Sequence, residues 1–220
     1  MCAVQYKTVR AERSRGRILE AAEAHFAEEG YAATRLEDIA ESVGMRRAAL
    51  FYHFRDKREL YLAVLERIFG GLLEKIQAVL HTSAPLPQRI EAAISAWVSY
   101  VGEHPSLPKI LLREGSKVPP ERREDVDRLA APFLAVIREV FAEGVREGHF
   151  HQPPIGPLHF VSAIVGATVF FVGAIPSFVP DLDFDPISPE HLEAHRREML
   201  TIARRLLGIR GPKLVKAWQE

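Results

Sequence analysis

Apolar residues recur along most of the chain at the three- and four-residue spacing that one face of an α-helix requires. Near the amino terminus this pattern predicts a helix over residues 10–29 and a shorter helix over residues 34–43. The apolar faces of these two helices consist of Ile18, Leu19, Ala22, Phe26, Leu36, Ile39, Ala40 and Val43. The sequence lacks the strict alternation that is typical of strands, so it predicts an all-α protein.

The helical spacing continues to the end of the chain and gives about nine helices in all. The remaining predicted helices cover residues 46–53, 56–81, 87–104, 105–114, 121–148, 157–175 and 189–207. Pro132 lies inside one of them and predicts a kink, because proline lacks the backbone donor. The apolar run from Val161 to Ile175 is shorter than the ~20 residues that cross a bilayer. We interpret it as a buried helix and expect no membrane partner.

Residues 34–57 contain two short predicted helices joined by a tight turn. Thr34 lies three residues before Glu37, which is the spacing of a capping box. Gly44 follows the first helix and can adopt the positive φ of a turn at little cost. The second helix places Leu50 and Phe54 inward and Arg46, Arg47, Ala49 and Tyr52 outward. This order predicts a helix-turn-helix motif, whose second helix enters the DNA major groove.

Further residues around this motif form a recognisable set: Ile18, Leu19, Ala22, Phe26, Gly30, Tyr31, Thr34, Ile39, Ala40, Val43, Gly44, Leu50, Tyr52, His53, Phe54, Lys57 and Leu60. With them, residues 18–60 resemble the DNA-binding domain of the tetracycline-repressor (TetR) family of bacterial transcription regulators. The resemblance implies a three-helix DNA-binding domain over residues 1–56. It also implies a larger helical domain over residues 57–220 that binds an effector and forms a homodimer.

The resemblance implies a transcription regulator and not an enzyme. Repression is the commonest mode of the family, so we expect a repressor that releases its operator when a small molecule binds the C-terminal domain. Control by a protein partner is an alternative, and an all-helical small-molecule-binding protein or enzyme is a weaker one. His149 and His151 in a Pro-rich loop are a poor metal signal, and we expect no cofactor.

The outward side of the second helix supplies the candidate DNA contacts. Arg46 and Arg47 suit bidentate bonds to guanine O6 and N7, although contact with phosphate is an open alternative. Ala49 can present its methyl group to a thymine methyl. Tyr52, His53 and Lys57 are phosphate contacts by family resemblance, and Thr34 combines capping with phosphate binding. A structural hydrogen bond is the alternative for His53.

Four positions depart from the common family pattern. Arg46 replaces the usual small hydroxyl cap, and Ala48 and Ala49 stand where Gly and Thr are frequent. Phe51 replaces a frequent Tyr. Two hydroxyl donors to phosphate are therefore missing, so the family's phosphate contacts at positions 49 and 51 are not carried over.

The overall charge is unusual for a nucleic-acid binder, because the net charge is zero and the pI is about 7.2. A local basic surface is sufficient, since phosphate attraction is screened beyond roughly 8–10 Å. The amino-terminal arm supplies such a surface with Lys7, Arg10, Arg13, Arg15 and Arg17. The single cysteine, Cys2, permits no intramolecular disulfide, which agrees with a cytoplasmic location.

A single helix-turn-helix covers few base pairs, so we expect a homodimer on a palindromic double-stranded operator. The two C-terminal helices are the predicted dimer interface, where they form a four-helix bundle with their copies. The candidate contacts are Val161, Val165, Val169, Leu192, His195, Met199, Ile202 and Leu206. Packing of both helices within one protomer is the alternative.

Large aromatic residues on the central helices are the candidates for a small-molecule site. They are Trp97, Tyr100, Phe133, Phe141, Phe170 and Phe171. Because apolar cavities with few polar anchors are typical ligand sites, we expect a largely apolar effector. Core packing is the alternative for each of these residues.

Overall fold

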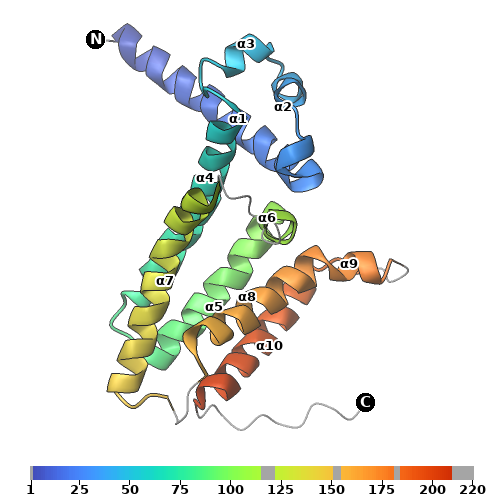
Figure 1. Cartoon of the computed structure of the whole chain (residues 1–220). Helices are drawn as coiled ribbons and strands as arrows, with labels where there is room; N and C mark the ends of the chain where they lie inside the picture. The colour runs from blue at the N-terminus through green and yellow to red at the C-terminus, as the bar shows by residue number, and fades with distance from the viewer. Residues whose placement is uncertain (1, 115–121, 151–154, 181–183, 210–220) are drawn as a thin grey trace. The chain divides into compact units, whose positions relative to one another are not determined.

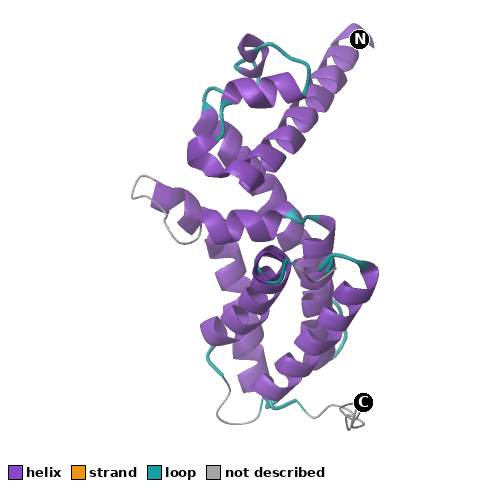
Figure 2. Cartoon of the chain, turned by 90° about the vertical axis from the view of Figure 1, so that its right-hand side faces the viewer, coloured by secondary structure: helices purple, strands orange, loops and turns teal. Residues whose placement is uncertain are grey.

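The computed structural model describes residues 2–114, 122–150, 155–180 and 184–209, with side chains for all of these except residues 2–10 and 114. The described helices are α1 (Cys2–Ala33), α2 (Leu36–Ser42), α3 (Arg47–Leu50), α4 (Lys57–Leu80), α5 (Leu86–Glu103), α6 (Ser106–Glu114), α7 (Arg123–Arg146), α8 (Pro157–Gly173), α9 (Ile175–Phe178) and α10 (Pro189–Leu207) (Figure 1). Figure 2 shows only helices and loops in this part of the chain, which confirms the all-α class. The additional helix, α9, is too short for apolar periodicity to reveal.

The chain folds into two compact units. The first comprises Met1–Gly71 and His104–Ala130, and the second comprises Leu72–Glu103 and Ala131–Glu220. Helices α4 and α7 therefore contribute residues to both units. The expected boundary between residues 56 and 57 separates DNA binding from effector binding. It stays a prediction, because compactness and function are different criteria for dividing a chain.

The first unit has an apolar centre to which its first four helical segments all contribute. Ile18 of α1, Ile39 of α2, Leu50 of α3 and Leu60 of α4 are fully buried, and Phe54 is 1% exposed. These are the inward positions that the sequence pattern predicts. The short helices α2 and α3 are held by this shared core, because one or two turns of helix are not stable alone in water.

A buried carboxylate joins three helices of the first unit. Glu23 of α1 is only 9% exposed, and Arg67 of α4 donates from Nη2 to its Oε2 at 2.6 Å. The hydroxyl of Ser106 in α6 donates to the other carboxylate oxygen. Both oxygens of this charged group are thus satisfied, which offsets the cost of removing it from water.

The expected capping box at Thr34 is wrong. α2 begins at Leu36, so Arg35 occupies the N-cap position and makes no side-chain cap. Thr34 is 2% exposed and its hydroxyl donates to the carbonyl of Gly30 at 2.8 Å. Gly30 has φ 81°, which interrupts α1, and its carbonyl also accepts from the backbone N–H of Thr34 at 3.2 Å. Thr34 therefore closes the end of α1 and does not start α2.

The second helix of the motif is shorter than expected. The pattern predicts residues 46–53, whereas α3 ends at Leu50 and the chain continues in turns. One of these turns is closed by His53 N donating to the Leu50 carbonyl at 3.0 Å. The apolar spacing continues past the helix because a hydrogen-bonded turn still directs Phe54 into the core.

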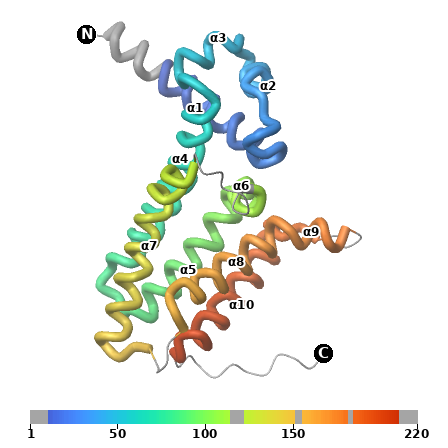
Figure 3. The backbone as a smooth tube through the Cα atoms, viewed as in Figure 1, coloured from blue at the N-terminus to red at the C-terminus, as the bar shows by residue number. Residues whose placement is uncertain are grey.

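In the second unit α10 packs against α5 and α8, as the backbone trace in Figure 3 shows. Gly102 permits the close approach of α5 and α10, because a Cβ there would lie 2.4 Å from Leu192 Cδ1. Farther along the same pair of helices, Arg204 donates from Nε and Nη2 to the two oxygens of Glu91, each at 2.7 Å. Gly208 ends α10 with φ 67°, a left-handed C-terminal cap.

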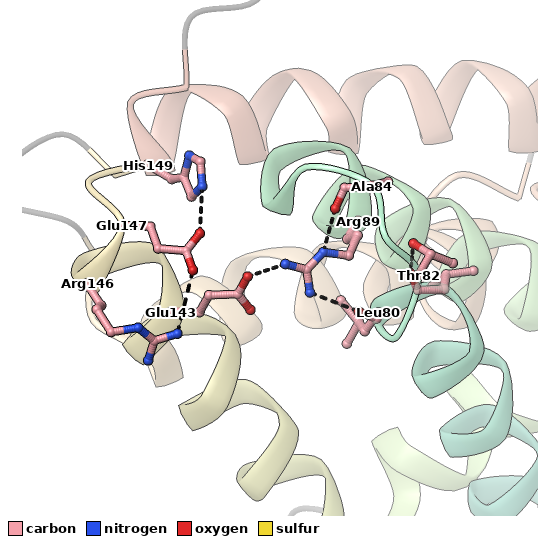
Figure 4. Close-up of polar contacts among 9 residues, drawn as sticks. Leu80, Thr82, Ala84, Arg89, Glu143, Arg146, Glu147 and His149 are labelled. Carbon is pink, nitrogen blue, oxygen red and sulfur yellow. Dashed lines mark hydrogen bonds and ion pairs between the residues drawn. The ribbon is translucent and has the colours of Figure 1, made fainter.

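Arg89 joins the end of α4 to α7 within the same unit (Figure 4). Its guanidinium donates to the carbonyl of Ala84 from Nε and to the carbonyl of Leu80 from Nη1, each at 2.9 Å. Its remaining nitrogen pairs with Glu143 of α7. The carbonyl of Leu80 is one that the end of a helix leaves without an intrahelical donor. Arg89 thus satisfies the terminus of α4 and neutralises a carboxylate of α7.

Candidate DNA-binding surface

The turn between α2 and α3 is closed by backbone hydrogen bonds. Gly44 adopts φ 69°, and its N–H donates to the carbonyl of Glu41 at 2.9 Å. The N–H of Met45 donates to the carbonyl of Ala40 at 2.8 Å. A residue with a side chain would be strained at this positive φ, which is the physical reason for glycine here. The turn fixes the direction in which α3 leaves α2.

The outer side of α3 is exposed, as the pattern of outward positions predicts. Arg46, Arg47 and Ala49 are all exposed, and Tyr52 is 83% exposed. The inner side of the same segment is fully buried at Leu50. A large aromatic side chain this exposed contributes little to the described core. This segment therefore presents a cationic, partly aromatic surface.

Arg47 differs from Arg46 in its surroundings. Arg47 Nη1 lies 2.8 Å from Glu37 Oε1 of α2, and its guanidinium carbon lies 5.3 Å from the centre of the Phe51 ring. Among the described residues, these are the side-chain contacts of Arg47. The geometry holds Arg47 between α2 and the turn after α3.

The two predicted phosphate contacts that follow α3 have different surroundings. The ring of His53 contacts Tyr52 edge to face, with centroids 5.3 Å apart. Among the described residues its ring makes no hydrogen bond, which favours an external partner over a structural one. Lys57 donates from Nζ to the carbonyl of Ala32 at 3.0 Å and lies over the Tyr31 ring. It thus also ties the start of α4 to the end of α1.

The amino-terminal arm adds positive charge to the same unit. Arg15 lies over the Phe54 ring at 4.9 Å, and Arg17 Nη2 donates to the carbonyl of Val43 at 2.9 Å. Both arginines therefore lie against the helix-turn-helix core. The side chains of Lys7 and Arg10 lie outside the described residues. The local basic surface expected from the sequence thus includes two arginines that the fold holds at the motif.

The aromatic candidates for an effector site belong to separate clusters. Phe141 contacts Phe150 and Phe160, with ring centroids 5.4 and 5.6 Å apart. Phe170 is 46% exposed and stacks on Phe178, while Phe171 stacks on His195. The structure thus does not bring these rings into one group.

Three further candidates lie on the central helices. Tyr100 is buried and lies under Lys75, and Phe133 is partly exposed. Trp97 is 6% exposed, and its indole Nε1 has no hydrogen-bond partner among the described residues. A buried donor without an acceptor is costly, so an acceptor placed beside the Trp97 indole would gain a hydrogen bond.

The predicted dimer contacts divide into buried and partly exposed residues. Val169, His195 and Met199 are buried within one protomer, and Leu192 packs against Gly102. The partly exposed members are Val161, Val165, Ile202 and Leu206. The most exposed side of α8 was not in the predicted set of interface contacts and consists of Leu158, Ser162, Gly166 and Phe170. Their constant four-residue spacing is the signal that could have identified it.

His195 is part of a hydrogen-bonded chain between α10 and α8. Thr168 donates its hydroxyl proton to the carbonyl of Ile164 at 2.9 Å, so its oxygen accepts from His195 Nε2–H at 3.0 Å. Burial lowers the pKa of His195 to about 4, which keeps the ring neutral in the folded protein at pH 7.

A helix-turn-helix whose outer side is exposed and cationic is typical of DNA-binding proteins, and this chain has that feature. Residues 18–64 match the tetR family of bacterial regulatory proteins, and residues 83–169 match the tetracyclin repressor-like C-terminal domain. The transcriptional regulator RutR of Escherichia coli is 30% identical over 162 residues, which cover 72% of this chain and 74% of RutR. The chain therefore belongs to the tetR family of bacterial regulatory proteins, and it is a DNA-binding transcription regulator.

Two further similarities bear on function. The transcriptional activator FasR of Mycolicibacterium smegmatis is 38% identical over 104 residues, which are 47% of this chain and 47% of FasR. The solved structure of FadR from Bacillus subtilis in complex with stearoyl-CoA matches with a TM-score of 0.68 and 18% identity. That match covers 88% of this chain and 98% of FadR. At such identity the likeness concerns the fold alone.

The sequence predicts no membrane-spanning helix and no metal site, and both expectations can be compared with the described residues. No helix in these ranges is long and apolar enough to cross a membrane. His149 contacts Glu147 at 3.1 Å, whereas His151 lies outside the described residues. Within the ranges that the structure covers, no group of three metal-binding side chains occurs.

The pKa of His195 predicts a dependence of stability on pH. The folded chain holds this ring neutral down to about pH 4, whereas an unfolded histidine binds its proton near pH 6.5. The unfolded state therefore gains stability as the pH falls from 6.5 towards 4. We expect wild type to lose about 1–2 kcal/mol more unfolding free energy between pH 7 and pH 5 than His195→Gln.

Urea unfolding of both proteins at the two pH values measures this difference. The comparison with His195→Gln removes the contribution of the other histidines, which both proteins share. Equal pH dependence in the two proteins would show that His195 is not held neutral by the fold.

Proposed function

We propose that this chain is a ligand-responsive repressor that binds a palindromic operator as a homodimer in the cytoplasm. A small molecule that binds the C-terminal domain lowers the affinity for the operator. The observation that carries the proposal is the α3 segment, which is fully buried at Leu50 and exposed at both arginines. A segment held in this way presents its outer residues to the major groove without reorganisation.

The exposed residues divide into base contacts and phosphate contacts. Arg46 and Arg47 reach guanine edges, and Ala49 contacts a thymine methyl. Tyr52, His53 and Lys57 bind phosphate, which positions the protein on the duplex without reading its sequence. Lys57 is the first residue of α4, where the N–H of Glu59 donates to the Asp56 carboxylate at 2.8 Å, so Lys57 would bind phosphate through its side chain. Thr34 contributes by shaping the corner between α1 and α2.

The exposed side of α8 supports a dimer interface. Leu158 and Phe170 are 67% and 46% exposed, and the small residues Ser162 and Gly166 lie between them along the helix. A Cβ at Gly166 would meet no atom within 4 Å, so no described residue covers this side of the helix at Gly166. We expect it to pack against its copy, with partly exposed α10 residues at the margin.

The unpartnered donor of Trp97 supports an effector that carries a neutral acceptor oxygen on a largely apolar body. Such a molecule would satisfy the indole N–H and leave the surrounding apolar residues in contact with its chain. The FadR structure contains stearoyl-CoA, which has both a long apolar chain and a thioester carbonyl. Long-chain acyl thioesters are therefore the class of effector that we propose.

Binding of an effector changes DNA affinity only as far as the effector distinguishes two conformations of the protein. Release from the operator is the mode that we propose. The name of FasR records an activator, so a reporter gene placed behind the operator decides the sign. Expression that rises when the chain is deleted supports repression, and expression that falls contradicts it.

Selection of bound genomic fragments tests the DNA-binding assignment. Wild type should enrich a palindromic sequence, and Arg47→Ala should lose preference at one base position in each half-site. The expected loss is about ten-fold, because a bidentate arginine–guanine pair contributes ~1–3 kcal/mol of discrimination. Arg138→Ala on α7 is the matched control and should keep the wild-type preference. Equal preference in wild type and Arg47→Ala would contradict base reading by Arg47.

Gly166→Leu tests the dimer interface. The added Cβ meets no described atom within 4 Å, so the fold should persist while the packing of two copies is blocked. We expect monomers in sedimentation velocity and a loss of operator affinity of more than about ten-fold, because one half-site contact is lost. Gly70→Leu on α4 also finds open space and should leave the dimer intact. A Gly166→Leu protein that sediments as a dimer would place the interface elsewhere.

Calorimetry with palmitoyl-CoA tests the role of Trp97. Trp97→Phe keeps a buried ring but removes the donor, so palmitoyl-CoA should bind about three- to ten-fold more weakly than to wild type. S-hexadecyl-CoA lacks the carbonyl and should bind both proteins with equal affinity. Trp218→Phe is the control for loss of an indole. Unchanged binding to Trp97→Phe would exclude the proposed hydrogen bond, and failure of wild type to bind would exclude the effector class.

A further inference from the structure

We propose that Glu37 is a positioning residue that holds Arg47 in the orientation needed to read a base. This inference rests on the proposed reading of DNA by α3 and assigns a specificity role to a residue of α2. Glu37 itself does not contact the base. Its carboxylate lies 2.8 Å from Arg47 Nη1, across the turn of the helix-turn-helix.

Two contacts from different directions restrict the Arg47 side chain. Glu37 holds one terminal nitrogen, and Phe51, four residues along the chain from Arg47, lies 5.3 Å from the guanidinium carbon. Arginine presents five donors in a rigid planar fork, so a carboxylate at one nitrogen and a ring beside the guanidinium carbon restrict where the remaining donors point. The guanidinium is thus oriented before DNA arrives, and less side-chain freedom is lost on binding.

The same contacts determine which donors remain for DNA. Nη1 is engaged by Glu37, which leaves Nε and Nη2 on the opposite edge of the guanidinium. These two nitrogens form one of the edges that bind two acceptors at once, as Arg204 does with Glu91. Guanine presents O6 and N7 as such a pair of acceptors in the major groove. The pairing with Glu37 therefore leaves the donor set that guanine requires.

Arg46 provides the contrast within the same segment. It is exposed, and within the ranges that the structure describes its side chain makes no hydrogen bond, ion pair or ring contact. A long unrestrained cation suits phosphate, which accepts from many directions, better than a base edge, which accepts from one. This contrast changes the proposed role of Arg46 from a guanine contact to its alternative, a phosphate contact, and keeps base reading for Arg47.

A carboxylate at the position of Glu37 gives little folding stability and repels DNA phosphate, and this combination helps to identify its role. Its side chain is 41% exposed and that of Arg47 is 56% exposed, so the ion pair contributes little to folding stability. A carboxylate beside the DNA surface also repels phosphate and weakens non-specific binding. Replacing Glu37 by a neutral residue should therefore lower base discrimination and raise non-specific affinity. Loss of structural support alone would lower both.

Asp38 supplies a matched control, because it is the other acidic residue in the first turn of α2. Both carboxylates complement the positive end of the helix, so Glu37→Gln and Asp38→Asn remove the same charge from the same turn. Only Glu37 pairs with Arg47. A role in helix stability predicts equal effects of the two substitutions, whereas positioning of Arg47 predicts that only Glu37→Gln alters base preference.

The experiment measures base preference by selection from a randomised operator library with wild type, Glu37→Gln, Asp38→Asn and Arg47→Ala. We expect Glu37→Gln to reduce discrimination roughly three- to ten-fold at the one base position that Arg47→Ala also affects. Binding to a non-specific duplex should rise about two-fold in both acidic variants, since each loses one charge near phosphate. The Glu37→Gln/Arg47→Ala double variant should discriminate no worse than Arg47→Ala.

Wild-type preference in Glu37→Gln would overturn the inference. An equal loss at every operator position, together with a lower melting temperature than that of Asp38→Asn, would also overturn it and make Glu37 structural. A wild-type protein that selects no preferred sequence would overturn the proposed function as well. Both the proposed function and the inference are supported if wild type selects a preferred sequence and Glu37→Gln loses preference at the Arg47 position alone.

Discussion

The complete burial of Leu50 and Phe54 beneath the helix-turn-helix is the constraint on which the DNA-binding surface depends. α3 has only four residues and cannot be stable alone, so its direction is set by these contacts with α1, α2 and α4. Because the inner side is closed, the arginines and Tyr52 are left outside. The proposed DNA-binding surface is thus a consequence of core packing and not of local helix propensity.

Polar interactions inside the first unit extend this constraint to a helix far along the chain. Glu23 accepts from Arg67 of α4 and from Ser106 of α6, and Glu28 pairs with Lys109 of α6. The pKa of the Glu28 carboxyl is lowered by this lysine, in keeping with a stabilised charged form. A buried carboxylate is costly unless each partner stays in place. α6 is therefore held against α1 by contacts that depend on geometry more strongly than apolar packing does.

In the second unit, by contrast, apolar and small side chains dominate the outer side of α8, and no described residue of the protomer covers Gly166 there. His195 and Thr168 form a satisfied polar contact on the inner side, while Gly166 faces open space. A helix that is apolar on most faces requires cover on most faces, and α5 and α10 supply only part of it. This incomplete cover connects the fold to the proposed homodimer, just as the unpartnered Trp97 connects it to a proposed effector.

Periodicity and a few glycine positions were enough to predict the all-α class, the helix-turn-helix, its inward residues and the tetR resemblance. Those features depend on local spacing, which a single helix or turn expresses whatever its neighbours are. The position of Thr34 at the end of α1, the exposed side of α8 and the pairing of Glu37 with Arg47 emerged only in the folded chain. Each of these depends on which element covers which face, and that is decided by packing between segments whose separation in the sequence carries no periodic signal.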